Sequence, residues 1–211
     1  VDEAGRGSWA GPLVATACWI DFRKYKYLHS KINDSKKLNH FKRKEIILSL
    51  DNYVHYSSAI ATVYEIDEYG LSYANAIAMK RSIFSVIQVL TKHKEHSNKN
   101  FCIYIDGKFK PDFANLDKFL KHKSLKFNCS LVKTLIKGDS LSKTIALASI
   151  ISKETRDNIM KQLAINHSCY SFDNHFGYGT VEHKNAILKN GVSNLHRKSF
   201  KPVATIYSKN S

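Results

Sequence analysis

Four carboxylates occupy positions where α/β proteins often gather their chemistry. Asp2 and Glu3 close a short first strand, Asp106 follows an apolar run, and Asp139 follows another just before a helical pattern. Because functional sites form outside strand ends, we expect these side chains to converge. Clustered carboxylates repel one another unless a cation neutralises them, and oxygen ligands suit Mg²⁺ or Mn²⁺. Two such ions can promote phosphodiester hydrolysis, so the pattern predicts a divalent-metal nuclease.

Each of these carboxylates also has an ordinary structural interpretation. Asp106 precedes a glycine and fits a simple turn, and Asp139 fits a helix-entry position. Asp2 and Glu3 are strand neighbours, whose side chains normally point to opposite faces. Both can reach one site only if the glycine-rich turn after them breaks the alternation.

Two further groups of polar residues are predicted to lie outside the site. Glu154, Arg156 and Asp157 fit a solvated ion-pair face of a long helix. The ten histidines are scattered along the sequence, and His183 and His196 are expected to have surface or hydrogen-bonding roles.

Hydrophobic periodicity predicts the elements that position the carboxylates. The expected strands are Val1–Glu3, Leu13–Ile20, Val54–Val63, Phe101–Ile105 and Leu131–Ile136, and the expected helices are Asn39–Leu50, Ser72–Leu90 and Ser142–Leu163. Strands that alternate with helices indicate an α/β domain around a mixed sheet. No repeat or linker interrupts the chain, so residues 1–211 are predicted to form a single domain.

Composition narrows the possible partners. The 211 residues include 33 Lys and Arg against 18 Asp and Glu, a net charge of +15 that suits a polyanion such as nucleic acid or an anionic membrane. No apolar run approaches the roughly 20 residues of a membrane helix. The four widely spaced cysteines, Cys18, Cys102, Cys129 and Cys169, lack zinc-site spacing and are expected to be buried thiols. We therefore expect a cytoplasmic protein.

A literal dinucleotide fingerprint, G-x-G-x-x-A, spans Gly5–Ala10. The fingerprint requires a full strand before it and a helix after it. Here two acidic residues precede it and a strand pattern follows it, so we reject this interpretation.

Nine short motifs are spread over nearly the whole chain. They are VDEAGRG with AGPLVA (Val1–Ala15), NDSKKL (Asn33–Leu38), EID (Glu65–Asp67), AMKR (Ala78–Arg81), YIDG (Tyr104–Gly107), KGDS (Lys137–Ser140), ASIISKETRD (Ala148–Asp157), GYGT (Gly177–Thr180) and HRKSFKPV (His196–Val203). In sequence and order they resemble bacterial ribonuclease HII, a type 2 ribonuclease H.

The resemblance implies a ribonuclease H-like fold, with a mixed central sheet flanked by helices and a small C-terminal helical portion over roughly 160–211. It also implies Mg²⁺- or Mn²⁺-dependent endonucleolytic cleavage of the RNA strand in RNA/DNA hybrids. Cleavage 5′ of a single ribonucleotide in duplex DNA, leaving 3′-hydroxyl and 5′-phosphate ends, belongs to the same expectation. A monomer acting in ribonucleotide removal and primer removal is implied.

Individual roles follow from the same motifs. Asp2, Glu3, Asp106 and Asp139 look like the four catalytic, metal-binding carboxylates. The loop of Gly5, Arg6 and Gly7 matches the one that reads the ribose 2′-hydroxyl, the group that distinguishes RNA from DNA. Tyr178 matches an aromatic residue that stacks on the deoxyribose after the ribonucleotide, and Lys36 resembles a phosphate contact.

Some positions depart from the family pattern. Ser8-Trp9 replaces a common Pro-Leu, Phe176 stands where a lysine usually precedes G-Y, and Gly70-Leu71 replaces an Asn-Ile. The chain also starts at the predicted catalytic strand, whereas relatives have residues before it. The sequence leaves open a fragment or a natural start, and an upstream domain as in ribonuclease HIII, although the G-Y-G-T tyrosine favours HII.

Two other classes of protein compete with this interpretation. A non-catalytic hybrid-binding protein would explain the positive charge but not four placed carboxylates. A Holliday-junction resolvase would share the acidic cluster but would have no use for a G-R-G loop.

Overall fold

A computed structural model describes residues 1–21, 23–24, 32, 38–93, 96, 100–113 and 129–210. The strands are β1 (Asp2–Ala4), β2 (Leu13–Ile20), β3 (Val54–Ala61), β4 (Phe101–Asp106) and β5 (Cys129–Leu135). The helices are α1 (His40–Leu48), α2 (Val63–Tyr69), α3 (Leu71–Thr91), α5 (Gly138–Leu141), α6 (Lys143–Asn166), η4 (Ser168–Tyr170), α7 (Phe172–His175), α8 (Val181–Asn190) and α9 (Lys201–Asn210). The predicted strands and long helices are confirmed within a few residues.

The strands form a mixed sheet in two hydrogen-bonded parts. Strands β1, β2 and β3 pair antiparallel in that order, with Asp2 opposite Thr16, whereas β4 and β5 pair in parallel. Val1 joins the two parts, because its nitrogen donates to the Tyr104 carbonyl at 2.8 Å and its carbonyl accepts from the Asp106 N–H at 2.9 Å. The start of β1 is thereby fixed beside the end of β4.

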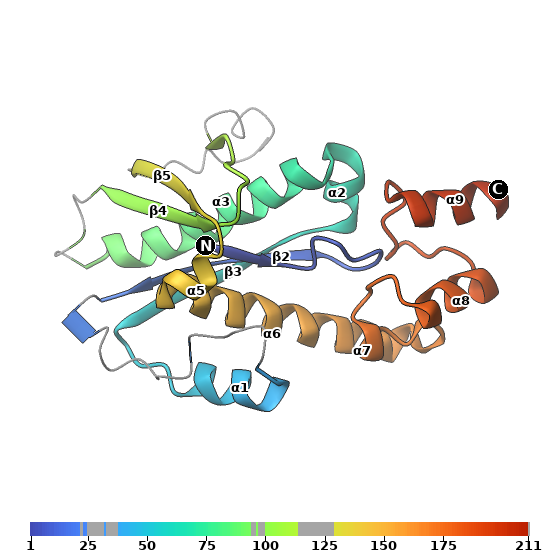
Figure 1. The fold of residues 1–211 in the computed structure, drawn as a ribbon, viewed down its shortest axis with the longest axis horizontal. Coiled ribbons are helices and arrows are strands. Elements are labelled where there is room, and N and C mark those ends of the chain that lie inside the picture. The colour runs from blue at the N-terminus through green and yellow to red at the C-terminus, as the bar shows by residue number, and fades with distance from the viewer. Residues whose placement is uncertain are drawn as a thin grey trace.

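Two long helices cover the sheet on opposite sides (Figure 1). The α3 face that packs on the strands includes small residues, Ala74 and Ala78, and larger ones, Met79 and Ile83, all buried. On the other side, Leu147 and Ile150 of α6 form a second apolar cluster. Burying an aliphatic side chain of this size stabilises the fold by about 1.5–3 kcal/mol, so these helices hold the sheet, and with it β1 and β4, in place.

The C-terminal part is helical, as expected, and lies at one end of the molecule (Figure 1). Phe172 and Tyr170 pack against Met160 of α6 in a third apolar cluster. The Asp67 carboxylate of α2 accepts hydrogen bonds from the backbone N–H groups of Lys198 and Ser199, at 2.9 and 3.0 Å. The E-I-D motif and the H-R-K-S-F motif therefore meet.

The predicted solvated face of α6 is wrong, because Glu154, Arg156 and Asp157 are all buried. Arg43 of α1 contacts Glu154 at 3.1 Å and Asp157 at 2.8 Å and so covers this face. Arg43 lies more than 100 positions from Glu154 and Asp157 in the chain, so the periodicity of α6 alone could not reveal this contact. The expectation of buried thiols is also wrong: all four cysteines are free, Cys102 and Cys169 are exposed, and Cys18 and Cys129 are only half-buried.

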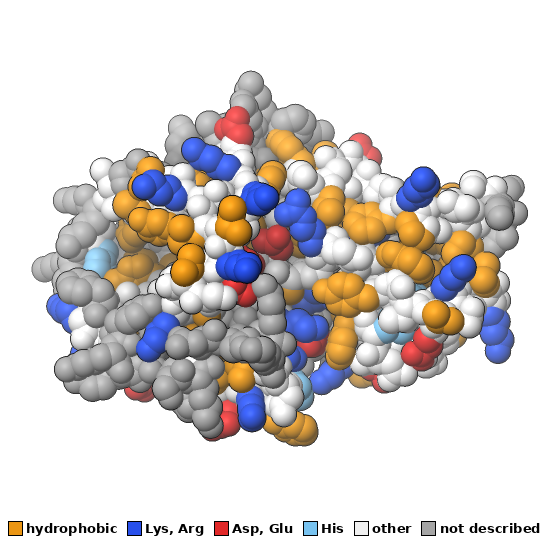
Figure 2. All heavy atoms as spheres, viewed as in Figure 1, with side chains coloured by type: hydrophobic (Ala, Val, Ile, Leu, Met, Phe, Trp, Pro, Cys, Tyr) orange, Lys and Arg blue, Asp and Glu red, His pale blue; other side chains and the backbone are white. Residues whose placement is uncertain are grey.

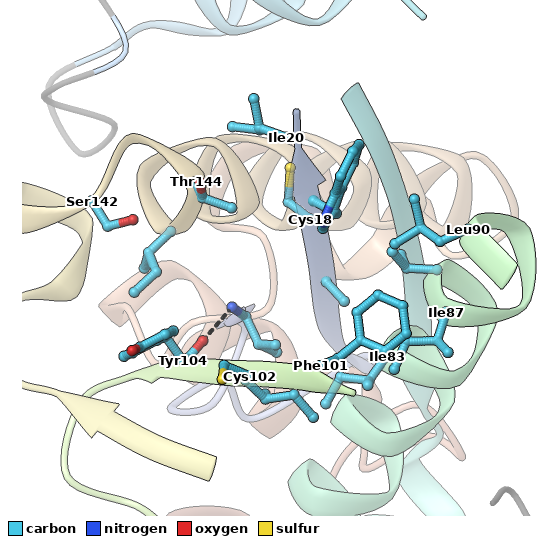
Figure 3. A pocket seen from close by; sticks show the side chains of 16 residues that line it. Cys18, Ile20, Ile83, Ile87, Leu90, Phe101, Cys102, Tyr104, Ser142 and Thr144 are labelled. Carbon is cyan, nitrogen blue, oxygen red and sulfur yellow. Dashed lines mark hydrogen bonds between the residues drawn. The ribbon is translucent and has the colours of Figure 1, made fainter. Parts of the chain in front are cut away.

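An apolar cavity of about 360 Å³ lies between β2 and β4 (Figure 3). Cys18 and Ile20 line it from β2, Phe101 and Cys102 from β4, and Leu90 from α3. None of the four predicted catalytic carboxylates lines this cavity. No helix in the described part of the chain is long and apolar enough to cross a bilayer.

Candidate active site

Three of the four carboxylates meet where β1 and β4 lie side by side. Asp2 is 7% exposed, and its Oδ1 accepts the Glu3 N–H at 2.8 Å. Burial, reinforced by the charges of Glu3 and Asp106 and opposed by a hydrogen bond from Ser149, raises the pKa of Asp2 to about 7. Burial and the Asp106 charge also raise the pKa of Glu3, against the effect of Arg6. Asp2, Glu3 and Asp106 therefore lie near enough for their charges to influence one another.

Asp139 lies next to this group on the short helix α5. The Gly138 N–H donates to Asp106 Oδ1 at 2.6 Å, which ties the start of α5 to the end of β4. Asp139 is the following residue and is 8% exposed. Asp139 is therefore a helix-entry residue, as its ordinary interpretation stated, and it also borders the acidic site.

The donor atoms of this site fit a hard divalent cation. They are carboxylate oxygens, and Glu3 Oε2 is buried without a hydrogen-bond partner, a state that normally calls for a missing ligand or ion. Among the described residues, no three acidic, histidine or cysteine side chains lie close enough to form a ready-made metal cage. The residues that could hold such an ion are Asp2, Glu3, Asp106 and Asp139.

Two buried arginines shape the loop that follows β1. Arg156 donates to the carbonyls of Pro12 at 3.0 Å, Ala10 at 3.1 Å and Phe176 at 2.8 Å. Arg197 donates to the Gly11 carbonyl at 2.9 and 3.0 Å and to the Arg6 carbonyl at 3.1 Å. Both side chains are 0% exposed. Sequence reasoning missed these roles, although both residues stand within the quoted motifs.

The residues that follow the G-R-G loop contact the G-Y-G-T segment directly. The Trp9 N–H donates to the Gly177 carbonyl at 2.8 Å. Gly5 has φ +87°, and a side chain there would overlap the Arg156 guanidinium. Gly177 has φ +77°, and a side chain there would overlap the Ala10 carbonyl. Glycine is required at both positions by the backbone and by the close approach of the two segments.

Tyr178 is exposed beside this loop. Its ring lies 5.4 Å from the Arg156 guanidinium carbon, and 38% of its surface is accessible. Gly7 is exposed, and Arg6 is partly exposed and contacts Glu3 at 3.4 Å. The structure therefore brings the G-R-G loop, the carboxylates and the G-Y-G-T segment into one connected region, whereas Lys36 lies outside the described residues.

The structure shows what surrounds two of the positions that depart from the family pattern. The Lys153 Nζ lies 4.7 Å from the centre of the Phe176 ring, so a positive charge remains beside the position where a lysine is common. Trp9 packs against His183, with ring centres 5.7 Å apart, and a side chain at Gly179 would overlap it.

A buried histidine cluster lies beneath the G-Y-G-T segment. His175 and His183 stack with ring centres 4.4 Å apart, and the Nε2 atoms of His183 and His196 are 3.1 Å apart. The Ser193 N–H donates to His196 Nδ1, so a neutral His196 carries its proton on Nε2 and donates to His183. His183 Nδ1 then donates to the Tyr178 carbonyl at 3.0 Å. The prediction of hydrogen-bonding roles is confirmed, but these histidines are buried rather than at the surface.

The cluster predicts acid sensitivity of the fold. Burial lowers the pKa of His183 and of His196 to about 4, from an ordinary value of 6.5. Because the unfolded chain binds these protons first, the stabilisation is complete above pH 6.5 and is lost as the pH falls towards 4. We expect a loss of about 3 kcal/mol at most per histidine, measured by urea unfolding between pH 7.5 and 4. His196→Gln should flatten this dependence, and an unchanged slope would contradict the assignment.

The mixed sheet, the two covering helices and the acidic site at the junction of β1 and β4 define a ribonuclease H-type enzyme. A sequence model of the family described as Ribonuclease HII matches residues 1–203, and the chain belongs to this family. It is a ribonuclease H that acts on RNA/DNA hybrids.

Relatives in sequence cover nearly the whole chain. The chain is similar to Ribonuclease HII of Zymomonas mobilis, with 35% identity over 98% of this chain and 85% of the relative. Ribonuclease HII of Chlamydia abortus is 38% identical over 98% of this chain and 85% of its own length.

Solved structures confirm the fold. Ribonuclease H2 from Pyrococcus horikoshii OT3 matches with a TM-score of 0.70 at 23% identity, covering 99% of this chain and 95% of that one. Bst-RNase HIII in complex with Mn²⁺ matches with a TM-score of 0.72 at 19% identity, covering 99% and 68%. The expected ribonuclease H-like fold is confirmed.

Proposed function

We propose that this enzyme hydrolyses the RNA strand of RNA/DNA hybrids and also cuts 5′ of a single ribonucleotide in duplex DNA. The products would carry 3′-hydroxyl and 5′-phosphate ends, and the activity would serve ribonucleotide removal and RNA primer removal. The observation that carries the proposal is the connection of the G-R-G loop to the G-Y-G-T segment beside the carboxylates. Arg156 packs against Gly5 and donates to the Phe176 and Ala10 carbonyls, and Trp9, just after the loop, donates to Gly177.

In this proposal the acidic residues would hold the metal ions, and the G-R-G loop would bind the ribose. Bound Mg²⁺ or Mn²⁺ ions would supply activation of the attacking water and stabilisation of the leaving oxygen. Asp2, Glu3, Asp106 and Asp139 would hold the ions at the scissile phosphate. The loop from Gly5 to Gly7 would present its backbone to the ribose, and its position is fixed by Arg197, which donates to the Arg6 carbonyl. Selection of the ribose would then take place next to the carboxylates.

The surrounding surface suits a duplex. Figure 2 shows acidic side chains near the centre of one face with Lys and Arg side chains around them. With a net charge of +15, such a surface binds phosphates without reading the base sequence. The enzyme would thus take its specificity from the ribose and not from the bases.

A panel of labelled duplexes tests the proposal. Duplexes with zero, one or four ribonucleotides are incubated with the purified protein in Mg²⁺ or in EDTA. We expect cleavage only of the two ribonucleotide-containing duplexes, and only with Mg²⁺. Binding without cleavage would favour a hybrid-binding protein, and cutting of an all-DNA four-way junction would favour a resolvase.

Within this panel, Tyr178→Ala is expected to impair cleavage at a lone ribonucleotide more than cleavage of four. An aromatic ring packed on one sugar removes apolar surface from water, and burying about 60 Å² of it contributes about 1.5 kcal/mol, so a loss of about tenfold should appear in kcat/KM on the single-ribonucleotide duplex. Tyr64→Ala removes a tyrosine of α2 that is 68% exposed, and it is the control. Equal losses on both substrates would remove the proposed junction role of Tyr178.

A further inference from the structure

Asn75 has a buried side-chain amide, and the proposed chemistry gives this group no role. It lies on α3 and is 0% exposed, between the apolar residues Ala74 and Ala76. Neither its Oδ1 nor its Nδ2 has a hydrogen-bond partner, although both atoms are buried. Buried side-chain amides are nearly always satisfied, so an unsatisfied one calls for a functional explanation.

The ionisable group beside Asn75 is the Glu3 carboxylate on β1, the strand against which α3 packs. Burial raises the pKa of Glu3, and the hydrogen-bonding influence of the nearby Asn75 side chain acts in the opposite direction. Glu3 Oε2 is itself buried without a hydrogen-bond partner, and Oε1 has only a long contact with Arg6 at 3.4 Å. A potential donor and a potential acceptor are thus buried near each other without a completed hydrogen bond.

We propose that Asn75 is a positioning residue for Glu3, donating from Nδ2 to the carboxylate when Glu3 turns to hold a divalent cation. This inference rests on the proposed metal-dependent cleavage. Groups that hydrogen-bond a ligating carboxylate fix its orientation, and their loss typically weakens metal binding 10–100-fold. An amide suits the role because it orients Glu3 without adding negative charge beside Asp2 and Asp106.

The test measures Mn²⁺ binding to the purified protein without substrate. Free Mn²⁺ is followed by electron paramagnetic resonance for the wild type, Asn75→Ala and Asn75→Thr. We expect Asn75→Ala to weaken Mn²⁺ binding about 10–100-fold, and Asn75→Thr to restore part of the affinity through its hydroxyl donor. The Mn²⁺ concentration that gives half-maximal cleavage should rise in parallel.

Ser82→Ala is the matched control, since Ser82 is equally buried on the same helix but donates to the Met79 carbonyl. It should leave Mn²⁺ affinity unchanged, and thermal unfolding without metal shows whether each variant is folded. Wild-type Mn²⁺ affinity in a folded Asn75→Ala protein would overturn the proposal, as would equal losses in Asn75→Ala and Ser82→Ala. Failure of the wild type to bind Mn²⁺ or to cleave would instead overturn the proposed function.

Discussion

Replacing Asp106 by asparagine is expected to reduce cleavage of an RNA/DNA hybrid at least 1000-fold, or about 4 kcal/mol of transition-state stabilisation, while hybrid binding persists. The amide keeps the shape of the side chain, and its oxygen can still accept the Gly138 N–H that Asp106 Oδ1 accepts at 2.6 Å. The negative charge that would help hold the ions is lost. Single-turnover cleavage and binding in EDTA, measured on the same hybrid, separate the two effects.

Asp2→Asn should behave in the same way, because Asp2 shares the site. Asp51→Asn, at an exposed position before β3, is the charge-matched control and should retain full activity. Retained cleavage by purified Asp2→Asn or Asp106→Asn would disprove the catalytic assignment of these carboxylates.

Substituting Gly5 by alanine is expected to lower both stability and activity. Gly5 has φ +87°, which costs an alanine about 1–2 kcal/mol. The new methyl group would also overlap the Arg156 guanidinium, which is buried and donates to three carbonyls. Displacing this charge from its partners adds about 1–3 kcal/mol. We expect a total loss of about 3 kcal/mol in urea unfolding and, because the loop moves, a loss of at least 100-fold in kcat/KM.

Gly191→Ala separates the cost of the positive φ from the cost of displacing Arg156. Gly191 ends α8 with φ +82°, and a side chain there meets nothing within 4 Å. It should show only the cost of the positive φ and keep its activity. If Gly5→Ala is no more destabilised than Gly191→Ala, then Arg156 is not the support of the loop.

Local sequence patterns were sufficient to predict the strands and helices and to single out the four acidic residues as candidates. The run FCIYI predicts the strand observed as β4 because its residue types favour a strand, and the apolar spacing in α3 predicts a helix whatever lies around it. The strand-end position of Asp106 and the turn after Glu3 likewise depend on neighbouring residues. The motif order then pointed to the family, and the family match confirms it.

Local sequence patterns could not predict contacts between residues that are far apart in the chain. The helical pattern predicts a solvated face for Arg156, yet the side chain is buried against Pro12, 144 positions away. Its partners are backbone carbonyls, which carry no sequence signal. His183 and His196 looked scattered, but the fold stacks them in one buried cluster. Asn75 lies in an otherwise apolar stretch of α3, and only its proximity to Glu3 gives it a task.

The sequence by itself determined which residues could perform the chemistry and which elements carry them, because residue type and local periodicity are properties of neighbouring positions. Only the tertiary structure decided what supports them. The two buried arginines, the histidine cluster and Asn75 act on atoms brought near by folding, and burial in a low-dielectric interior makes each of those contacts strong.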